Sequence, residues 1–154
     1  MPAYFCDTSA IIKRYIKEKG SQFVEGIADL KSGNKIFLAQ IAQVEIAAAI
    51  ARKQRGNLLT QADAQNALTL FQYDLTNNYL NIEISQTLLN EAVSIATKHA
   101  LRGYDAVQLS SAMQANFELL QKNLSPLVFV SADNELNAAA ISEGLTVENP
   151  NNYP

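Results

Sequence analysis

Segments that favour β-strands alternate along this chain with segments that favour α-helices, and this alternation limits the fold more than any other feature. Short apolar or alternating stretches typical of strands lie at residues 3–7, 36–38, 79–84, 127–130 and 145–148. Helical stretches separate them, at residues 8–18, 21–31, 40–55, 60–77, 85–99, 105–122 and 133–143. Because strands separated by helices pair in parallel through right-handed crossovers, we expect an α/β fold: a three-layer α/β/α sandwich around a parallel sheet of about five short strands.

The length of 154 residues suits one domain with a sizeable core, and no repeat or linker divides the chain. We expect this domain to cover residues 1–148, followed by a polar, loosely held tail over residues 149–154. The sequence contains no apolar run long enough to span a membrane, no visible signal peptide and a single cysteine. These features predict a cytoplasmic protein without a disulfide.

Four acidic residues stand at positions that favour burial. Asp7 ends the first strand, Glu45 interrupts the apolar helix 40–55, Asp105 opens a helix, and Asp133 follows the strand 127–130. Burying an unpaired carboxylate costs on the order of several kcal/mol. With no obvious cationic partner nearby in sequence, these four suggest a bound metal ion, and oxygen ligands favour Mg²⁺ or Mn²⁺.

The expected topology would bring these acids together. Ligands of open α/β sheets bind outside the carboxyl ends of the strands, where Asp7 and Asp133 lie and which Asp105 could also face. Each acid has a simpler explanation: Asp7, Asp105 and Asp133 could be helix N-caps, and Glu45 could face solvent. Glu45 has the weakest alternative, because it is expected in the middle of an apolar helix.

Hydroxyl groups accompany two of the acids. Thr8 and Ser9 follow Asp7, and Ser131 precedes Asp133 by two residues. Such hydroxyls would orient a ligating carboxylate or a metal-bound water.

The basic residues give a less specific signal. The net charge of −3 is not typical of a protein that coats nucleic acid, and solvated helix faces explain each basic cluster. We nevertheless consider those nearest the acids, Lys13, Arg14 and Arg102, as candidate phosphate contacts. His99, the only histidine, is expected to be a solvated helix-end residue, and Cys6 a small buried side chain.

Four segments together resemble the PIN-domain family of metal-dependent ribonucleases, most closely the compact VapC-type toxins of type II toxin–antitoxin pairs. The segments are Phe5–Ile12, Gln43–Arg52, Leu101–Leu109 and Phe129–Leu136. Their order and spacing agree with the family over nearly the whole chain. The acidic quartet of the family falls on Asp7, Glu45, Asp105 and Asp133, and its hydroxyls fall on Thr8 and Ser131.

The resemblance implies an endoribonuclease that hydrolyses RNA phosphodiester bonds with Mg²⁺ or Mn²⁺, leaving 5′-phosphate and 3′-hydroxyl ends. Asp7, Asp105 and Asp133 would be the main metal ligands. Glu45 would bind the metal directly, bind it through water, or help to activate the nucleophile. The resemblance also implies a homodimer and a cognate antitoxin whose peptide covers the cleft.

Three alternatives remain open at this point. An aspartyl-phosphate phosphatase would need a second acid two residues after Asp7, where Ser9 stands. A phospho-receiver module would need an acidic pair before the acceptor strand and a later strand-end lysine, and neither is evident. A PIN-like module that binds RNA or protein without cutting is the third alternative.

Overall fold

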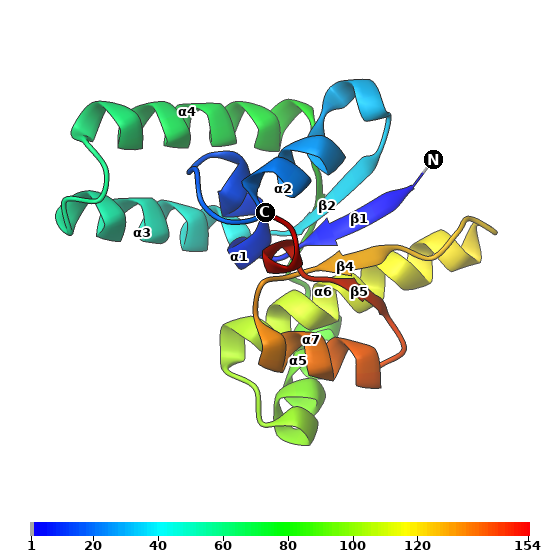
Figure 1. Cartoon of the computed structure of the whole chain (residues 1–154). Coiled ribbons are helices and arrows are strands. Elements are labelled where there is room, and N and C mark those ends of the chain that lie inside the picture. The colour runs from blue at the N-terminus through cyan, green and yellow to red at the C-terminus, as the bar shows by residue number, and fades with distance from the viewer. Residues whose placement is uncertain (1) are drawn as a thin grey trace.

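The structure is a computed structural model that describes residues 2–154. Its centre is a five-stranded, fully parallel sheet with the strand order β3-β2-β1-β4-β5 (Figure 1). The strands are β1 (Ala3–Cys6), β2 (Lys35–Ala39), β3 (Leu80–Ile82), β4 (Val128–Val130) and β5 (Thr146–Glu148). The order reverses at β1, so the carboxyl end of β1 lies at a switch point, where open parallel sheets bind their ligands.

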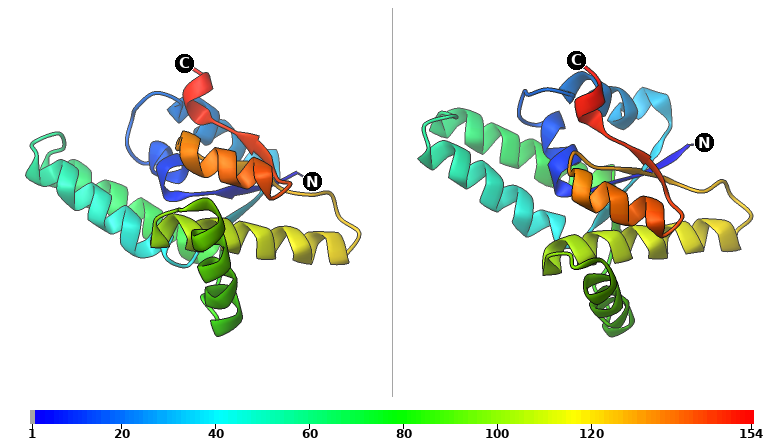
Figure 2. Two further views of the ribbon diagram at one scale, coloured as in Figure 1. Left: turned by 90° about the horizontal axis from the view of Figure 1, so that it is seen from below. Right: turned by 60° about the horizontal axis from the view of Figure 1, so that its bottom comes forward.

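Seven α-helices among residues 2–154 connect and cover the strands. They are α1 (Thr8–Ile11), α2 (Ser21–Ala28), α3 (Ala42–Arg55), α4 (Gln61–Asn77), α5 (Gln86–His99), α6 (Gly103–Gln121) and α7 (Asn134–Ser142). Short 3₁₀ turns occur at Ile12–Arg14, Leu30–Ser32 and Pro150–Asn152. Helices α1 to α4 lie on one side of the sheet and α5 to α7 on the other (Figures 1 and 2). The predicted three-layer α/β/α fold is therefore confirmed.

A hydrophobic core lies on each face of the sheet. Successive residues of each central strand point into opposite cores, because side chains alternate across a sheet. Phe5 and Phe129 stack with ring centroids 5.8 Å apart in the core beneath α5, α6 and α7. Cys6 and Val130, the next residues along, belong to the core beneath α1 to α4. This double burial explains why the strands are continuously apolar in sequence.

Three predicted segments differ most from the structure. The helix expected over 21–31 ends at Ala28. The helix expected over 8–18 is only α1 followed by a 3₁₀ turn. The tail expected to be loosely held is packed: Pro150 is buried, and the Tyr153 ring stacks on Phe23 at a centroid distance of 4.2 Å. The Tyr153 hydroxyl also donates a hydrogen bond to Glu148 at 3.0 Å. Aromatic stacking therefore holds a segment whose composition alone suggests a free end.

Within residues 2–154, no helix combines the length and hydropathy that a membrane crossing requires.

Candidate active site

Asp7 occupies the carboxyl end of β1 and caps α1, yet it is only 4% exposed. Its Oδ1 accepts hydrogen bonds from Ser9 Oγ at 2.7 Å and from the Ala10 amide at 3.0 Å. Its Oδ2 accepts one from Ser131 Oγ at 2.6 Å. No ion pair within residues 2–154 includes Asp7. The structure therefore buries this carboxylate among hydroxyl and amide donors, and no basic side chain within residues 2–154 pairs with it.

The same two hydroxyls join β1 to the segment after β4. Ser9 Oγ accepts a hydrogen bond from the Ala132 amide at 2.9 Å, and Ser131 Oγ accepts one from the Asp133 amide at 3.1 Å. The buried Asn137 side chain donates to the Ser131 carbonyl at 2.8 Å. Ser9 and Ser131 thus orient Asp7 and position the start of α7 at once.

Glu45 lies in the first turn of α3, because the helix begins at Ala42; the expectation of a mid-helix position was wrong. A negative charge is favourable in a first turn, so the helix itself tolerates this acid. Glu45 Oε1 accepts hydrogen bonds from Thr8 Oγ1 at 3.0 Å and from Gln108 Nε2 at 2.8 Å. Thr8 therefore orients Glu45, whereas Asp7 is oriented by Ser9 and Ser131.

Asp133 and Asp105 occupy different helix positions. Asp133 is the N-cap of α7, where its Oδ1 accepts from the amides of Glu135 and Leu136 at 3.0 and 3.1 Å. Asp105 is not a cap, because α6 begins at Gly103 and its N-cap is Arg102. Asp105 instead stands in the first turn of α6. The capping explanation therefore holds for Asp133 and fails for Asp105.

The four acids share one electrostatic environment. Burial raises the pKa of Asp7 to about 6; the hydrogen bonds from Ser131, Ser9 and Ala10 oppose this rise, and the charge of Asp105 adds to it. Burial also raises the pKa of Asp105, followed by the charges of Asp133 and Glu45, while Arg102 acts in the opposite direction. Asp105 therefore interacts electrostatically with all three other acids of the quartet.

The donor set fits a hard divalent cation, since every polar atom that these acids offer is oxygen. Asp7 is also buried, without an ion-pair partner within residues 2–154, and close to other carboxylates. A bound cation would offset the repulsion among these charges. No three His, Cys, Asp or Glu side chains among residues 2–154 are placed so that they could hold one ion together. Direct coordination would therefore involve one or two of these carboxylates, with water completing the shell, as is common for Mg²⁺.

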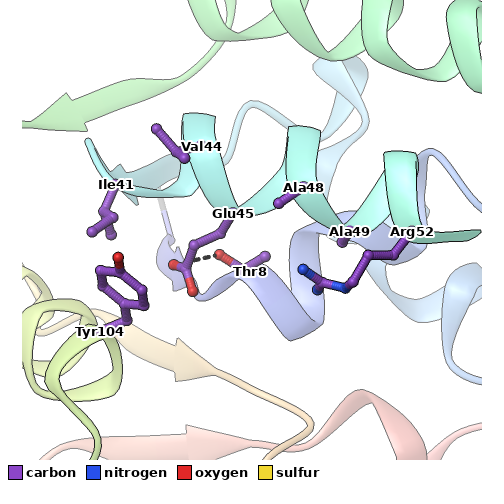
Figure 3. Close-up of a pocket in the computed structure, with 8 residues that line it drawn as sticks. All are labelled: Thr8, Ile41, Val44, Glu45, Ala48, Ala49, Arg52 and Tyr104. Carbon is purple, nitrogen blue, oxygen red and sulfur yellow. Dashed lines mark hydrogen bonds between the residues drawn. The ribbon is translucent and has the colours of Figure 1, made fainter.

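A cavity of about 450 Å³ opens beside Glu45 and Thr8, between α3 and the start of α6 (Figure 3). Tyr104 stands at one end of the cavity, and Arg52 extends into it from the other end. Of the four acids, Glu45 therefore lines a space that can admit a ligand.

Two of the three candidate phosphate contacts already have acidic partners. Lys13 is buried and pairs with Glu18 at 3.0 Å, and Arg14 pairs with Asp74 at 3.2 Å. The structure does not place either among the lining residues of the cavity. Arg102 differs, because it is exposed and acts electrostatically on Asp105.

The two remaining sequence candidates lie outside the acidic site. His99 is not solvated as expected: its side chain is 13% exposed, and its Nε2 lies 2.6 Å from Glu143 Oε2. Cys6 is buried, as predicted, and burial raises the pKa of its thiol far above the ordinary range.

Sequence reasoning missed three residues of the site: Gln108, Tyr104 and Arg52. Gln108 is 1% exposed and also donates to Thr8 Oγ1 at 3.1 Å. The sequence does indicate a role for Gln108, because it is a polar residue among apolar neighbours one helical turn after Asp105. Tyr104 and Arg52 carry no such signal, since an exposed tyrosine and a helix-end arginine are ordinary surface residues.

Comparison with known proteins agrees with this geometry. Residues 4–141 match the PIN domain family. Ribonuclease VapC45 from Mycobacterium tuberculosis (strain CDC 1551 / Oshkosh) is 31% identical over 113 residues, which cover 73% of this chain and 76% of that protein. The chain therefore belongs to the PIN-domain family and is of the VapC type.

Solved structures support the fold. A chain of VapBC2 from Rickettsia felis, crystallised with a DNA fragment from their promoter, has a TM-score of 0.64 at 14% identity, covering 96% of this chain and 98% of that one. VapC20 from Mycobacterium tuberculosis, described as a toxin that cleaves the sarcin–ricin loop, has a TM-score of 0.60 at 13% identity, covering 88% and 94%. At these identities the likeness concerns the fold alone.

Proposed function

We propose that this protein is a divalent-metal-dependent endoribonuclease that hydrolyses RNA phosphodiester bonds. The observation that carries the proposal is Asp7: a buried carboxylate at the switch point of the sheet, held by two serines, next to Asp105 and paired with no basic side chain among residues 2–154. The relatives named ribonuclease VapC give the reaction class. The phosphatase alternative is not favoured, because Ser9 orients Asp7 where that enzyme would need an acid.

Asp7 and Asp105 would hold the metal directly, with Asp133 and Glu45 contributing through bound water. Mg²⁺ or Mn²⁺ bound there would lower the pKa of a water molecule and offset charge on the phosphate. Glu45 has one committed oxygen, Oε1, so we assign Oε2 as the atom that takes the proton of the attacking water. The water oxygen would add to phosphorus, the bond from phosphorus to the 3′ oxygen would break, and the 3′ oxygen would take a proton from solvent, which gives 5′-phosphate and 3′-hydroxyl ends.

The direct test is cleavage of structured and single-stranded RNA with Mg²⁺, Mn²⁺ or EDTA. We expect cleavage with metal, none with EDTA, and a loss of at least roughly 100-fold in the Asp7→Asn variant. The matched control is Asp63→Asn, an exposed acid in the first turn of α4. Metal-independent RNA binding without cleavage, unchanged by Asp7→Asn, would show a non-catalytic module instead.

We further propose that the protein is the toxin of a toxin–antitoxin pair, a cytoplasmic homodimer whose antitoxin covers the cleft. The support is the relationship to the proteins named ribonuclease VapC; chains from VapBC2 and FitAB structures share the fold. Co-expression with the product of a short neighbouring gene should restore growth that this protein alone arrests. Sedimentation of the purified protein measures the oligomeric state, and a monomer at all concentrations would contradict the dimer.

A further inference from the structure

The cavity beside Glu45 has an apolar wall and two distinct ends. Ile41, Val44, Ala48 and Ala49 line it along α3, and Val44 is 71% exposed. Its volume of about 450 Å³ falls within the range of small-molecule sites, roughly 300–1,000 Å³. The space can therefore take one flat organic group next to the acidic site.

Tyr104 supplies an aromatic surface at one end. The side chain is 64% exposed, and its ring stands below Ile41 at the edge of the cavity (Figure 3). None of the aromatic pairs within residues 2–154 includes Tyr104, so its ring faces are not stacked on another ring of the chain. An exposed ring of this kind is a platform on which a nucleobase can stack.

Arg52 supplies a cation at the other end. Figure 3 shows its guanidinium directed back along α3 toward Thr8. Arg52 belongs to no ion pair within the described part of the chain, in contrast to Arg14 with Asp74. A free guanidinium can contact phosphate oxygens through two parallel hydrogen bonds.

We propose that this cavity binds one unpaired nucleotide of the substrate, with its base on Tyr104 and a phosphate on Arg52. The assignment rests on the proposed ribonuclease function, because Glu45 and Thr8 line the same cavity. A base within a helix cannot use the site, since its faces are covered by its neighbours in the stack and RNA grooves hide its edges. An apolar side chain from a protein partner, the alternative occupant, would cover Val44 but would leave Arg52 without an anion. The cavity therefore selects single-stranded RNA.

The test measures the affinity of the protein for fluorescein-labelled oligo(U) and oligo(A) in EDTA, by fluorescence anisotropy. We expect Tyr104→Ala to weaken binding about 5-fold or more and Tyr104→Phe to bind as the unaltered protein does, because the ring remains. Arg52→Ala should weaken binding and reduce the slope of log affinity against log salt by about 0.7. An oligo(A)·oligo(U) duplex should compete poorly.

Two matched controls come from the same chain. Tyr73→Ala removes a similarly exposed tyrosine on α4, and Arg55→Ala removes an exposed cation on α3 that does not line the cavity. Both should bind oligonucleotides normally, and thermal melting should show every variant folded. Equal losses in variants and controls, no loss in Tyr104→Ala, or a duplex that competes as well as single strands would overturn the proposal.

Cleavage by the unaltered protein with Mn²⁺ separates this inference from the proposed function. If the unaltered protein cuts RNA but Tyr104→Ala binds oligonucleotides normally, the assignment of the nucleotide site is wrong and the nuclease function is retained. If nothing is cut but binding depends on Tyr104 and Arg52, the nuclease is wrong and the nucleotide site stands.

Discussion

Gln108 Nε2 donates a hydrogen bond to Glu45 Oε1 at 2.8 Å, and so joins the second turn of α6 to the first turn of α3 across the candidate site. The same nitrogen donates to Thr8 Oγ1 at 3.1 Å, while Gln108 Oε1 is buried without a partner within residues 2–154. Tolerating an unpaired buried oxygen costs on the order of 1–3 kcal/mol. The arrangement therefore holds Glu45 in place at some expense in stability.

Replacing Gln108 by Leu should release Glu45 while keeping the core filled. We expect kcat for RNA cleavage to fall roughly 10- to 100-fold, as for other residues that orient a catalytic acid, with KM nearly unchanged. The free energy of unfolding should change by less than about 2 kcal/mol, because the unpaired oxygen is removed together with the hydrogen bonds. Gln114→Leu, on the same helix and away from Glu45, is the control; an equal loss of kcat there would contradict the role of Gln108.

The buried Asp7 predicts how stability depends on pH without metal. Its pKa is about 6, against about 3.9 for an exposed Asp. Between these values the folded protein binds a proton that the unfolded chain has lost, so the free energy of unfolding falls as pH rises from about 4 to about 6 and then levels off. The total change is on the order of 2 to 3 kcal/mol.

Urea unfolding in EDTA across this pH range measures the effect. Asp7→Asn should remove most of the pH dependence and be the more stable protein at neutral pH. Asp63→Asn should keep the dependence of the unaltered chain, since Asp63 is exposed. A stability that rises through this window in the unaltered protein would contradict the assignment to Asp7.

Metal binding should stabilise the folded chain, because a cation offsets the repulsion among Asp7, Asp105 and their neighbours. Saturation at roughly 100 times the Kd adds about 2.7 kcal/mol, which raises the Tm of a chain of this size by several degrees. In EDTA the Asp105→Asn variant should have a higher Tm than the unaltered protein, and Mn²⁺ should raise its Tm by less. A Tm that Mn²⁺ raises equally in both proteins would exclude Asp105 as a ligand.

Gly20 and Gly26 offer a matched pair at the two ends of one helix. Gly20 precedes α2 with a φ of +84°, and a Cβ there would lie 2.5 Å from the Pro150 carbonyl oxygen. Gly26 is within α2, and a Cβ there would meet nothing within 4 Å. Urea unfolding should show Gly20→Ala destabilised by about 1 kcal/mol or more, because a positive φ and the packed tail both oppose the methyl group.

Gly26→Ala should instead be neutral or stabilising by about 0.4–1 kcal/mol, since it only reduces the freedom of the unfolded chain. Equal effects of the two substitutions would contradict both the positive φ of Gly20 and the packing of the tail against it.

The strands and helices were largely predictable, because apolar periodicity reports local geometry directly. Where the prediction differed, tertiary contacts decided the outcome. The expected helix over 8–18 ends early, and the tail is held by the ring of Phe23. Asp105 is not a cap because α6 starts two residues earlier, at Gly103. Such boundaries depend on neighbours that are distant in sequence.

For this protein, local pattern along the chain was enough to predict the layered α/β fold and to single out the four acids, although it misplaced Glu45 and Asp105 within their helices. Only the tertiary structure decided that Ser131 holds Asp7, that Gln108 and Thr8 hold Glu45, and that Tyr104 and Arg52 flank one cavity. The bonds from Thr8 to Glu45 and from Ser131 to Asp7 join residues 37 and 124 positions apart. Hydrogen bonds over such separations exist only once the crossovers have brought the strand ends together, so no local pattern encodes them.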